Sequence, residues 1–522
     1  MAKINVKRSL FTGALLLALS GLFVKVLGMI YKIPLTDALT ESGMGYFNTA
    51  YTVFSLFFVL SGSGIPTALS LTVARDLALG EGARAERRFV AMRQFSLVLG
   101  LFLTVLLLLF AKPLAFFLGS PLAYHALLAV APAVLFVTLS APIRGFCQGQ
   151  GDMLPTALSQ LAEAFLKLLF GLLLVYTAKR MQLSLFDAAA FAILGLSLST
   201  ALSFLILAIM AGKRISRRGS IHFDKPLFHD TLAAAIPVTV SSLAVSLAAS
   251  LDLLLLMRAL QSIGYTPDMA NAAWGNYSAL VLPLFHMPQV LLTPIAYAVL
   301  PALRALVSKG ERNAAKALTK TALRVTAILG ALCALGLSLF SRDALMLLYR
   351  DGDAVARAYP NLSLLAIAIF PLGIMTVTAS LLQANGKLWL PTVTLTLGAL
   401  VKILVTVFGV STFGESVSAI GTLFSYTVSA ALNLAALSVT LSHSLWTVAV
   451  IKPFALSVGA VLSATVLRTC LLAKGLPKTP VTLLSIALAA AVALFLAFLL
   501  KALTKEDFNL LGIGKRKQEY KG

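Results

Sequence analysis

The chain has 522 residues, of which 12% are charged and 59% are hydrophobic, and its mean hydropathy is +0.93. Soluble domains contain roughly 25% charged residues, so a water-soluble globular protein of this size is excluded. Lys and Arg outnumber Asp and Glu by 42 to 20, a net charge of +22. In a membrane chain this excess points to topology and lipid contacts and not to nucleic acid.

Apolar stretches long enough to cross the roughly 30 Å hydrocarbon core recur almost end to end and predict about fourteen transmembrane helices. The predicted spans are 10–31, 46–74, 94–111, 122–143, 154–177, 186–211, 231–257, 276–302, 323–341, 361–383, 388–410, 417–441, 448–473 and 480–502. The first span is too long for a signal peptide and lacks a small-residue cleavage site, so we expect it to be retained. The predicted fold class is an all-α polytopic membrane protein.

Most Lys and Arg residues outside these spans lie near the N-terminus, in the loops 75–93, 213–225 and 304–320, and in the tail 501–521. Positive residues near helix ends are held on the cytoplasmic side of a membrane. We therefore expect a multi-pass cell-membrane protein with both termini in the cytoplasm. Its basic loops should contact anionic lipids.

An internal repeat organises the chain. Gln148-Gly-Gln-Gly151, Pro155 and Lys167 recur as Gln383-Ala-Asn-Gly386, Pro391 and Lys402, at an offset of 235 residues for Gln, Gly and Lys. The duplication predicts two parallel six-helix repeats that form two lobes, plus two extra C-terminal helices. The predicted domains are an N-terminal lobe at 1–211, a C-terminal lobe at 230–442, the extra helix pair at 448–503 and a basic cytoplasmic tail at 504–522.

No catalytic pattern is found in the sequence. It contains no phosphate-binding loop, and its five histidines and three cysteines show no metal-ligand spacing. Asp351-Gly-Asp353 resembles the metal-binding motif of some glycosyltransferases, but a turn explains it equally well. We therefore expect a protein that is not an enzyme and has no resident cofactor or metal.

Ionisable residues at membrane depth are costly unless they face a partner or a watery cavity. Lys25 lies about 22 Å into the first helix at 1.5 Å per residue, and Lys32 follows seven residues later on nearly the same face. Two cations on one stripe could bind a pyrophosphate. In the alternative interpretation both side chains reach to the outer headgroups.

Further charged residues fall in or beside the predicted spans. Glu163 and Lys167 are spaced as an i, i+4 ion pair, and Lys402 is the equivalent of Lys167 in the second repeat. Asp252 is a candidate partner or coupling residue, or a solvated carboxylate at a helix end. Arg144 is a headgroup anchor or a contact at the inner gate. Together with Lys25 and Lys32, we predict that Lys167, Lys402 and Arg144 contact the substrate.

Helix breakers cluster in two of the predicted spans. The predicted hinges are Gly62, Gly64 and Pro66 in the second span and Pro283, Pro288 and Pro301 in the eighth. Proline kinks a helix, and broken helices are tolerated where they line a cavity or abut other helices. Bendable helices at matching places in both repeats indicate alternating access; ordinary kinks in a static bundle are the alternative.

At this point a family resemblance can be identified. The motifs that carry it are Lys25-Val-Leu-Gly28-Met-Ile-Tyr-Lys32-Ile-Pro34, Gly43-Met-Gly45-Tyr46, Ala50-Tyr51, Gly64-Ile-Pro66-Thr67-Ala68, Arg144-Gly145, Gln148-Gly149 and Met153-Leu-Pro155-Thr156-Ala157. The chain resembles the stage V sporulation protein B family. That family is related to the MurJ-type lipid II flippases of the multidrug/oligosaccharidyl-lipid/polysaccharide exporter superfamily.

The resemblance implies a flippase that moves an undecaprenyl-pyrophosphate-linked saccharide to the outer leaflet, for peptidoglycan, sporulation or another envelope polysaccharide. It also implies a cationic cavity between the lobes, with Lys25 and Lys32 as the basic residues of the first helix, and a lipid-tail groove formed by the last two helices. The second helix lacks the basic residues found in many MurJ relatives, and the eighth offers only His286. We expect a monomer, with an energy source that is either the membrane potential or a monovalent cation.

Two other functions stay open at this stage. A cation-coupled multidrug exporter of the same superfamily would require acidic cavity residues. A membrane glycosyltransferase or polysaccharide polymerase would require a sizeable extramembrane loop, whereas the longest predicted loops have only about twenty residues.

Overall fold

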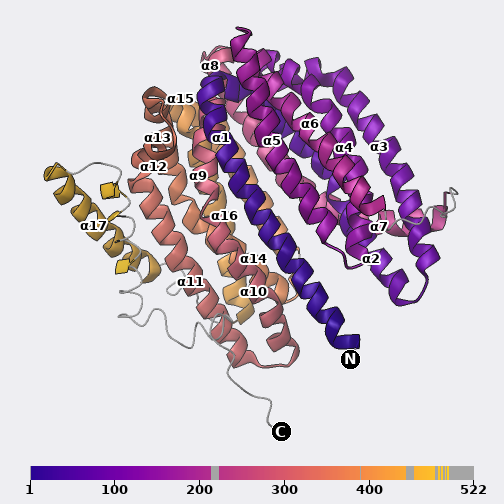
Figure 1. Cartoon of the computed structure of the whole chain (residues 1–522). Coiled ribbons are helices and arrows are strands. Elements are labelled where there is room, and N and C mark those ends of the chain that lie inside the picture. Colours follow the sequence, from indigo (N-terminus) through magenta and orange to yellow (C-terminus); the bar gives the residue numbers. More distant parts are fainter. Residues whose placement is uncertain are drawn as a thin grey trace. The chain divides into compact units, whose positions relative to one another are not determined.

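The computed structural model describes residues 2–212, 223–387, 389–441 and 452–475, with a few positions between 480 and 492 (Figure 1). These residues are almost entirely helical and contain no strand, which confirms the predicted all-α class. Within them, eight helices are long and apolar enough to cross a membrane, or nine if one bent pair is a single span. The total of fourteen stays a prediction. Most of the predicted span 480–502 and the whole tail 504–522 lie outside the described residues.

The chain divides into two compact units, Met1–Ala279 and Leu280–Gly522. The two predicted lobes, 1–211 and 230–442, stay a prediction, and the first compact unit also includes the next two helices. It does so because α7 (Lys225–Ser262) packs against α1 (Ala2–Gly62) and α2 (Gly64–Ala78), and α8 (Pro267–Asn276) packs against α1.

The first predicted span and the first part of the second lie in one helical run, α1, which kinks at Thr40. Thr40 has φ 59°, a left-handed conformation that threonine rarely adopts. The first helix therefore continues about two turns beyond the predicted end at residue 31, and Pro34 is accommodated inside it. Its extension carries the side chain of Lys32 away from the helix end and into the bundle.

Four further long helices complete the first unit. They are α3 (Gly82–Phe117), α4 (Tyr124–Gly149), preceded by the 3-10 turn η1 (Pro121–Ala123), α5 (Leu154–Arg180) and α6 (Leu185–Gly212). Small residues let these helices approach closely. A Cβ atom at Gly195 of α6 would lie only 2.5 Å from the backbone nitrogen of Gly171 on α5, so Gly195 cannot be replaced without moving a helix.

A π-helical turn, η2 (Tyr277–Val281), connects α8 to α9 (Leu282–His286) and leads into the second unit. The other helices of that unit are α10 (Gln289–Ser308), α11 (Arg312–Leu339), α12 (Ser341–Leu348), α13 (Gly352–Ile367), α14 (Ile369–Ala384), α15 (Leu390–Phe413), α16 (Val417–Leu441), after the 3-10 turn η3 (Gly414–Ser416), and α17 (Lys452–Ala473). Leu303, Leu323, Leu381 and Leu434, from four of these helices, belong to one buried apolar cluster.

The repeated motif forms the same turn in both units. Between α4 and α5, Gly151 has φ 81° and its N–H donates to the Gln148 carbonyl at 2.9 Å. Between α14 and α15, Gly386 has φ 84° and donates to the Gln383 carbonyl at 3.0 Å. Both glycines occupy the left-handed region that glycine adopts without strain, and a proline stands in the first two positions of each following helix. This is the geometry that a duplication predicts.

The second predicted span is interrupted at one residue, Ser63, which keeps right-handed helical backbone angles, and the eighth predicted span is bent. The helix ends at Gly62 and resumes at Gly64, while the N–H and hydroxyl of the intervening Ser63 both donate to the carbonyl of Val59. The segment that ends at His286 meets the one that begins at Gln289 at an angle of 48°. Proline at position 288 explains this bend, because it cannot donate a helical hydrogen bond.

Candidate substrate-binding site

Lys32 is anchored by the backbone of the π-helical turn. Its Nζ donates to the carbonyl oxygen of Ser278 at 3.0 Å. In a π-helix this carbonyl would accept from the residue five positions later, which is Pro283 and has no N–H. The lysine therefore supplies a donor that the helix itself lacks, and its charge is held in place by a neutral acceptor.

Polar contacts fix α8 against the kink in α1 and so position this carbonyl. The Tyr46 hydroxyl donates to the Asp268 carboxylate at 2.8 Å, and the Asn276 amide donates to the Glu41 carboxylate. A Cβ atom at Gly275 would overlap the backbone carbonyl of Glu41. Because both sides approach so closely, the Ser278 carbonyl cannot move far from Lys32.

Lys167 reaches the same region from α5. Its Nζ lies 5.8 Å from the ring centroids of both Tyr31 and Tyr51 on α1, a distance at which an ammonium group is attracted to an aromatic face. The charges of Lys32 and Lys167 repel each other. In the described part of the chain neither ammonium group forms an ion pair with a carboxylate, so the pair presents positive charge to an anion.

Glu163 is paired with Arg144 of α4, and not with Lys167 as predicted. The Arg144 guanidinium lies 3.3 Å from the Glu163 carboxylate, with side chains 11% and 22% exposed. A planar guanidinium suits a carboxylate better than a point charge does, and the Lys167 ammonium is directed to the two tyrosine rings instead. Arg144 and Glu163 therefore neutralise each other at the junction of α4 and α5.

The remaining predicted residues are more scattered. Lys25 is exposed on α1, seven residues before Lys32, and Asp252 is half-buried on α7. Lys402 belongs to the second unit. The aliphatic part of its side chain packs on Gly421 of α16, and the absence of a side chain at Gly421 leaves room for this contact. Among the described residues, no group of three or more His, Cys, Asp or Glu side chains could hold a metal ion.

Of the predicted hinge residues, Gly64 has the closest neighbours. A Cβ atom there would overlap the Thr239 side chain and the Ala235 carbonyl of α7. Pro66 packs on Gly145 of α4, because a Cβ atom at Gly145 would lie 2.8 Å from the Pro66 carbonyl oxygen. Pro283 opens α9, and Pro288 and Pro301 lie at and within α10. The interruption of the second span thus lies where α2 meets α4 and α7.

A charged cluster joins α2, α3 and α7, and sequence analysis did not predict it. The Arg88 and Asp76 side chains are fully buried and 2.6 Å apart, and Arg88 also lies 2.8 Å from Asp230. Asp230 lies just before the predicted span 231–257. Its partial burial raises the pKa of the carboxyl group, but hydrogen bonds from Arg75 and Arg88 outweigh this effect, so the pKa is lowered below its ordinary value. The cluster ties the first turns of α7 to the α2–α3 hairpin.

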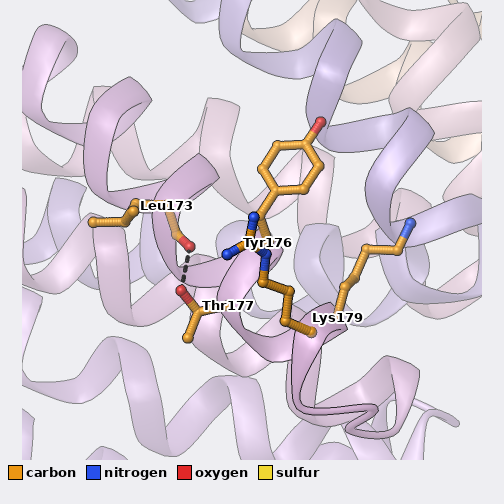
Figure 2. Close-up of a pocket in the computed structure, with 5 residues that line it drawn as sticks. Leu173, Tyr176, Thr177 and Lys179 are labelled. Carbon is orange, nitrogen blue, oxygen red and sulfur yellow. Dashed lines mark hydrogen bonds between the residues drawn. The ribbon is translucent and has the colours of Figure 1, made fainter.

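A shallow cavity of about 480 Å³ lies over the last turns of α5 (Figure 2). Its lining residues all come from this one helix: Leu173, Tyr176, Thr177, Lys179 and Arg180. The Thr177 hydroxyl donates to the Leu173 carbonyl at 2.8 Å (Figure 2). Exposed tyrosine and basic residues at a helix end are typical of a membrane–water interface, so we assign this cavity to lipid contact and not to the lysine site.

The sequence model of the family described as polysaccharide biosynthesis protein matches residues 10–307. Three relatives come from Bacillus subtilis (strain 168). The uncharacterized membrane protein YabM is 26% identical over 83% of this chain and 80% of its own length. Stage V sporulation protein B is 24% identical over 67% of this chain and 68% of its own length. Lipid II flippase MurJ is 23% identical over 76% and 77%.

Solved structures show the same fold. Lipid II flippase MurJ in an inward closed conformation matches with a TM-score of 0.73 and 14% identity, over 93% of this chain and 98% of that one. An inward-facing multidrug resistance MATE family transporter of the MOP superfamily matches with a TM-score of 0.63 and 16% identity, over 80% and 94%. The fold is therefore that of a multi-pass helical membrane protein of the MurJ and MATE type.

Proposed function

Because the chain belongs to the polysaccharide biosynthesis protein family, we propose that it is a flippase for a polyprenyl-diphosphate-linked saccharide. The cargo would be a lipid II-like or other envelope precursor on an undecaprenyl carrier, moved from the inner to the outer leaflet. The similarity to Lipid II flippase MurJ and stage V sporulation protein B supports this substrate class. The protein would carry cargo and catalyse no reaction.

The observation that carries the proposal is the pair of lysines on α1 and α5. Lys32 is held by a neutral carbonyl and Lys167 by two aromatic rings, and their charges repel each other. Two such ammonium groups at membrane depth are costly unless an anion neutralises them. A diphosphate supplies adjacent negative charges, and lysine is a common phosphate ligand.

Movement of the cargo requires the site to open to each leaflet in turn. The interruption at Gly62–Gly64 and the bend at Pro288 are the places where the helices would change direction. We propose alternating access at these hinges, with both termini in the cytoplasm, basic loops on anionic lipid, and a monomer as the working unit. The membrane potential or a monovalent cation would drive the cycle. Lys25, exposed on α1, would guide the diphosphate toward Lys32.

A cation-coupled multidrug exporter is the second candidate, favoured by the structural match to the MATE transporter. A cationic drug would need a negative site. Glu163, the predicted acidic residue nearest to Lys167 along α5, is already neutralised by Arg144. The charge that the site presents therefore favours an anionic cargo.

Complementation tests the proposal. A bacterium depleted of its own lipid-linked saccharide flippase should grow when it expresses this chain, and should fail to grow with Lys25→Ala at equal membrane abundance. Lys179→Ala, at the exposed end of α5, serves as the matched control and should support growth. Failure of the unaltered chain to support growth would contradict the proposed function. Normal growth with Lys25→Ala would contradict the role of Lys25.

A further inference from the structure

We propose that the ring of Tyr51 is the platform on which the saccharide of the cargo stacks, beside the lysine pair that takes the diphosphate. This inference rests on the proposed function, since it names the part of the same site that recognises the sugar. Tyr51 is 38% exposed, whereas the neighbouring rings of Tyr31, Phe47 and Phe54 are 3%, 3% and 6% exposed. It is therefore a ring with a free surface in an otherwise buried aromatic row.

The ring of Tyr51 is held rigidly. It stacks on Phe47 with ring centroids 6.1 Å apart and planes within 9°, and it packs against Phe54 at 6.1 Å. All three residues lie in the part of α1 that follows the kink at Thr40. A ring fixed in this way loses little conformational entropy when a ligand lies against it.

The ring of Tyr51 lies beside the ammonium group of Lys167. Lys167 Nζ lies 5.8 Å from its ring centroid, and a charged side chain on a membrane-spanning helix faces the protein interior or a water-filled cavity, not lipid. Asn48, one turn earlier on α1, is 5% exposed, and its amide nitrogen has no hydrogen-bond partner among the described residues. A donor buried without a partner is costly, and a sugar hydroxyl or carbonyl can satisfy it.

The chemistry of this surface fits a sugar attached to a diphosphate. A pyranose ring presents an apolar C–H face that packs on an aromatic ring, and polar groups at its edge that need hydrogen bonds. Its anomeric oxygen is bonded directly to phosphorus, so a sugar on Tyr51 places the diphosphate beside Lys167. The hydroxyl of Tyr51 is not needed for this contact, but its ring is.

Two ligands separate the sugar contact from the phosphate contact. Purified protein in lipid nanodiscs is titrated with undecaprenyl diphosphate and with the same lipid carrying one N-acetylhexosamine. Tyr51→Leu should weaken binding of the sugar-bearing lipid about tenfold, the size of a strong aromatic contact. It should leave binding of undecaprenyl diphosphate within about twofold, because the ring of Tyr31 still contacts the Lys167 ammonium group. Tyr51→Phe should bind both ligands as the unaltered protein does.

Tyr176→Leu is the matched control, because Tyr176 is an exposed tyrosine of the interfacial cavity on α5 (Figure 2) and should leave both affinities unchanged. If Tyr51→Leu loses affinity equally for both ligands, or loses affinity for neither, the proposed role of Tyr51 as a platform is overturned while the flippase proposal stands. Failure of the unaltered protein to bind either lipid overturns both. Thermal unfolding midpoints of all variants verify that the bundle is intact.

Discussion

Replacement of Lys167 by glutamine tests the lysine pair. The substitution removes the charge and leaves a shorter, uncharged polar side chain beside the rings of Tyr31 and Tyr51. A hydrogen bond to a charged group contributes about 1.5–3 kcal/mol, and about 1.4 kcal/mol corresponds to a factor of ten in affinity. Lys167→Gln should therefore weaken binding of a lipid diphosphate by about ten- to a hundredfold. Because the substitution also removes the repulsion between the charges of Lys167 and Lys32, we expect the loss of affinity to lie toward the lower end of this range.

Titration of the protein in nanodiscs with undecaprenyl diphosphate measures this effect. Lys179→Gln is the control on the same helix, because Lys179 is exposed at the end of α5 and lies in the interfacial cavity. Its affinity should stay within about twofold of the unaltered protein. Unchanged affinity in Lys167→Gln, or an equal loss in Lys179→Gln, would refute the reasoning that the α1–α5 lysine pair holds the diphosphate.

Three further predictions concern the stability of the first unit and are read from thermal unfolding in detergent. Arg88→Ala leaves the fully buried carboxylate of Asp76 without its 2.6 Å partner and should destabilise the unit by about 3–5 kcal/mol; an unchanged unfolding midpoint would contradict this. Gly171→Val drives a side chain into the Tyr31 phenol and should cost about 1–3 kcal/mol; an unchanged unfolding midpoint would show that α1 and α5 separate freely and would contradict this. The pKa of Asp230 is lowered in the folded state. The ionised carboxylate therefore contributes its full stabilisation of the fold above the ordinary pKa of 3.8, and this stabilisation is lost as the pH falls through the lowered pKa. The midpoints of the unaltered protein and Asp230→Asn should accordingly converge on acidification, and a constant difference would contradict the assignment.

Hydrophobic runs and helix breakers predicted much of the fold. The described long helices lie where apolar stretches of spanning length occur, the second span is interrupted at Ser63, and Gly151 and Gly386 form equivalent turns. These features depend on local chemistry, because chain length, missing N–H groups and positive φ are properties of single residues and their neighbours. The kink at Thr40 was not predicted, since threonine carries no signal for a left-handed conformation.

The partners of the site residues could not be predicted in the same way. Glu163 was assigned to Lys167 from their spacing along one helix, whereas the packing of α4 on α5 brings Arg144 to it instead. Tyr31 and Tyr51 were recognised only as members of a motif, because no pattern within α1 indicates that Lys167 of α5 lies against their rings. Such pairings depend on which helix faces which, and that information is not contained in the periodicity of a single segment.

Transport in reconstituted liposomes tests the central claim most directly. Purified protein is offered a fluorescent undecaprenyl-diphosphate-linked saccharide and, in parallel, a fluorescent cationic dye, and the movement of each across the bilayer is followed with time. Lys32→Gln/Lys167→Gln is the matched inactive variant. The account predicts protein-dependent movement of the lipid-linked saccharide that the double substitution abolishes, with no movement of the dye. Transport of the dye alone would contradict it.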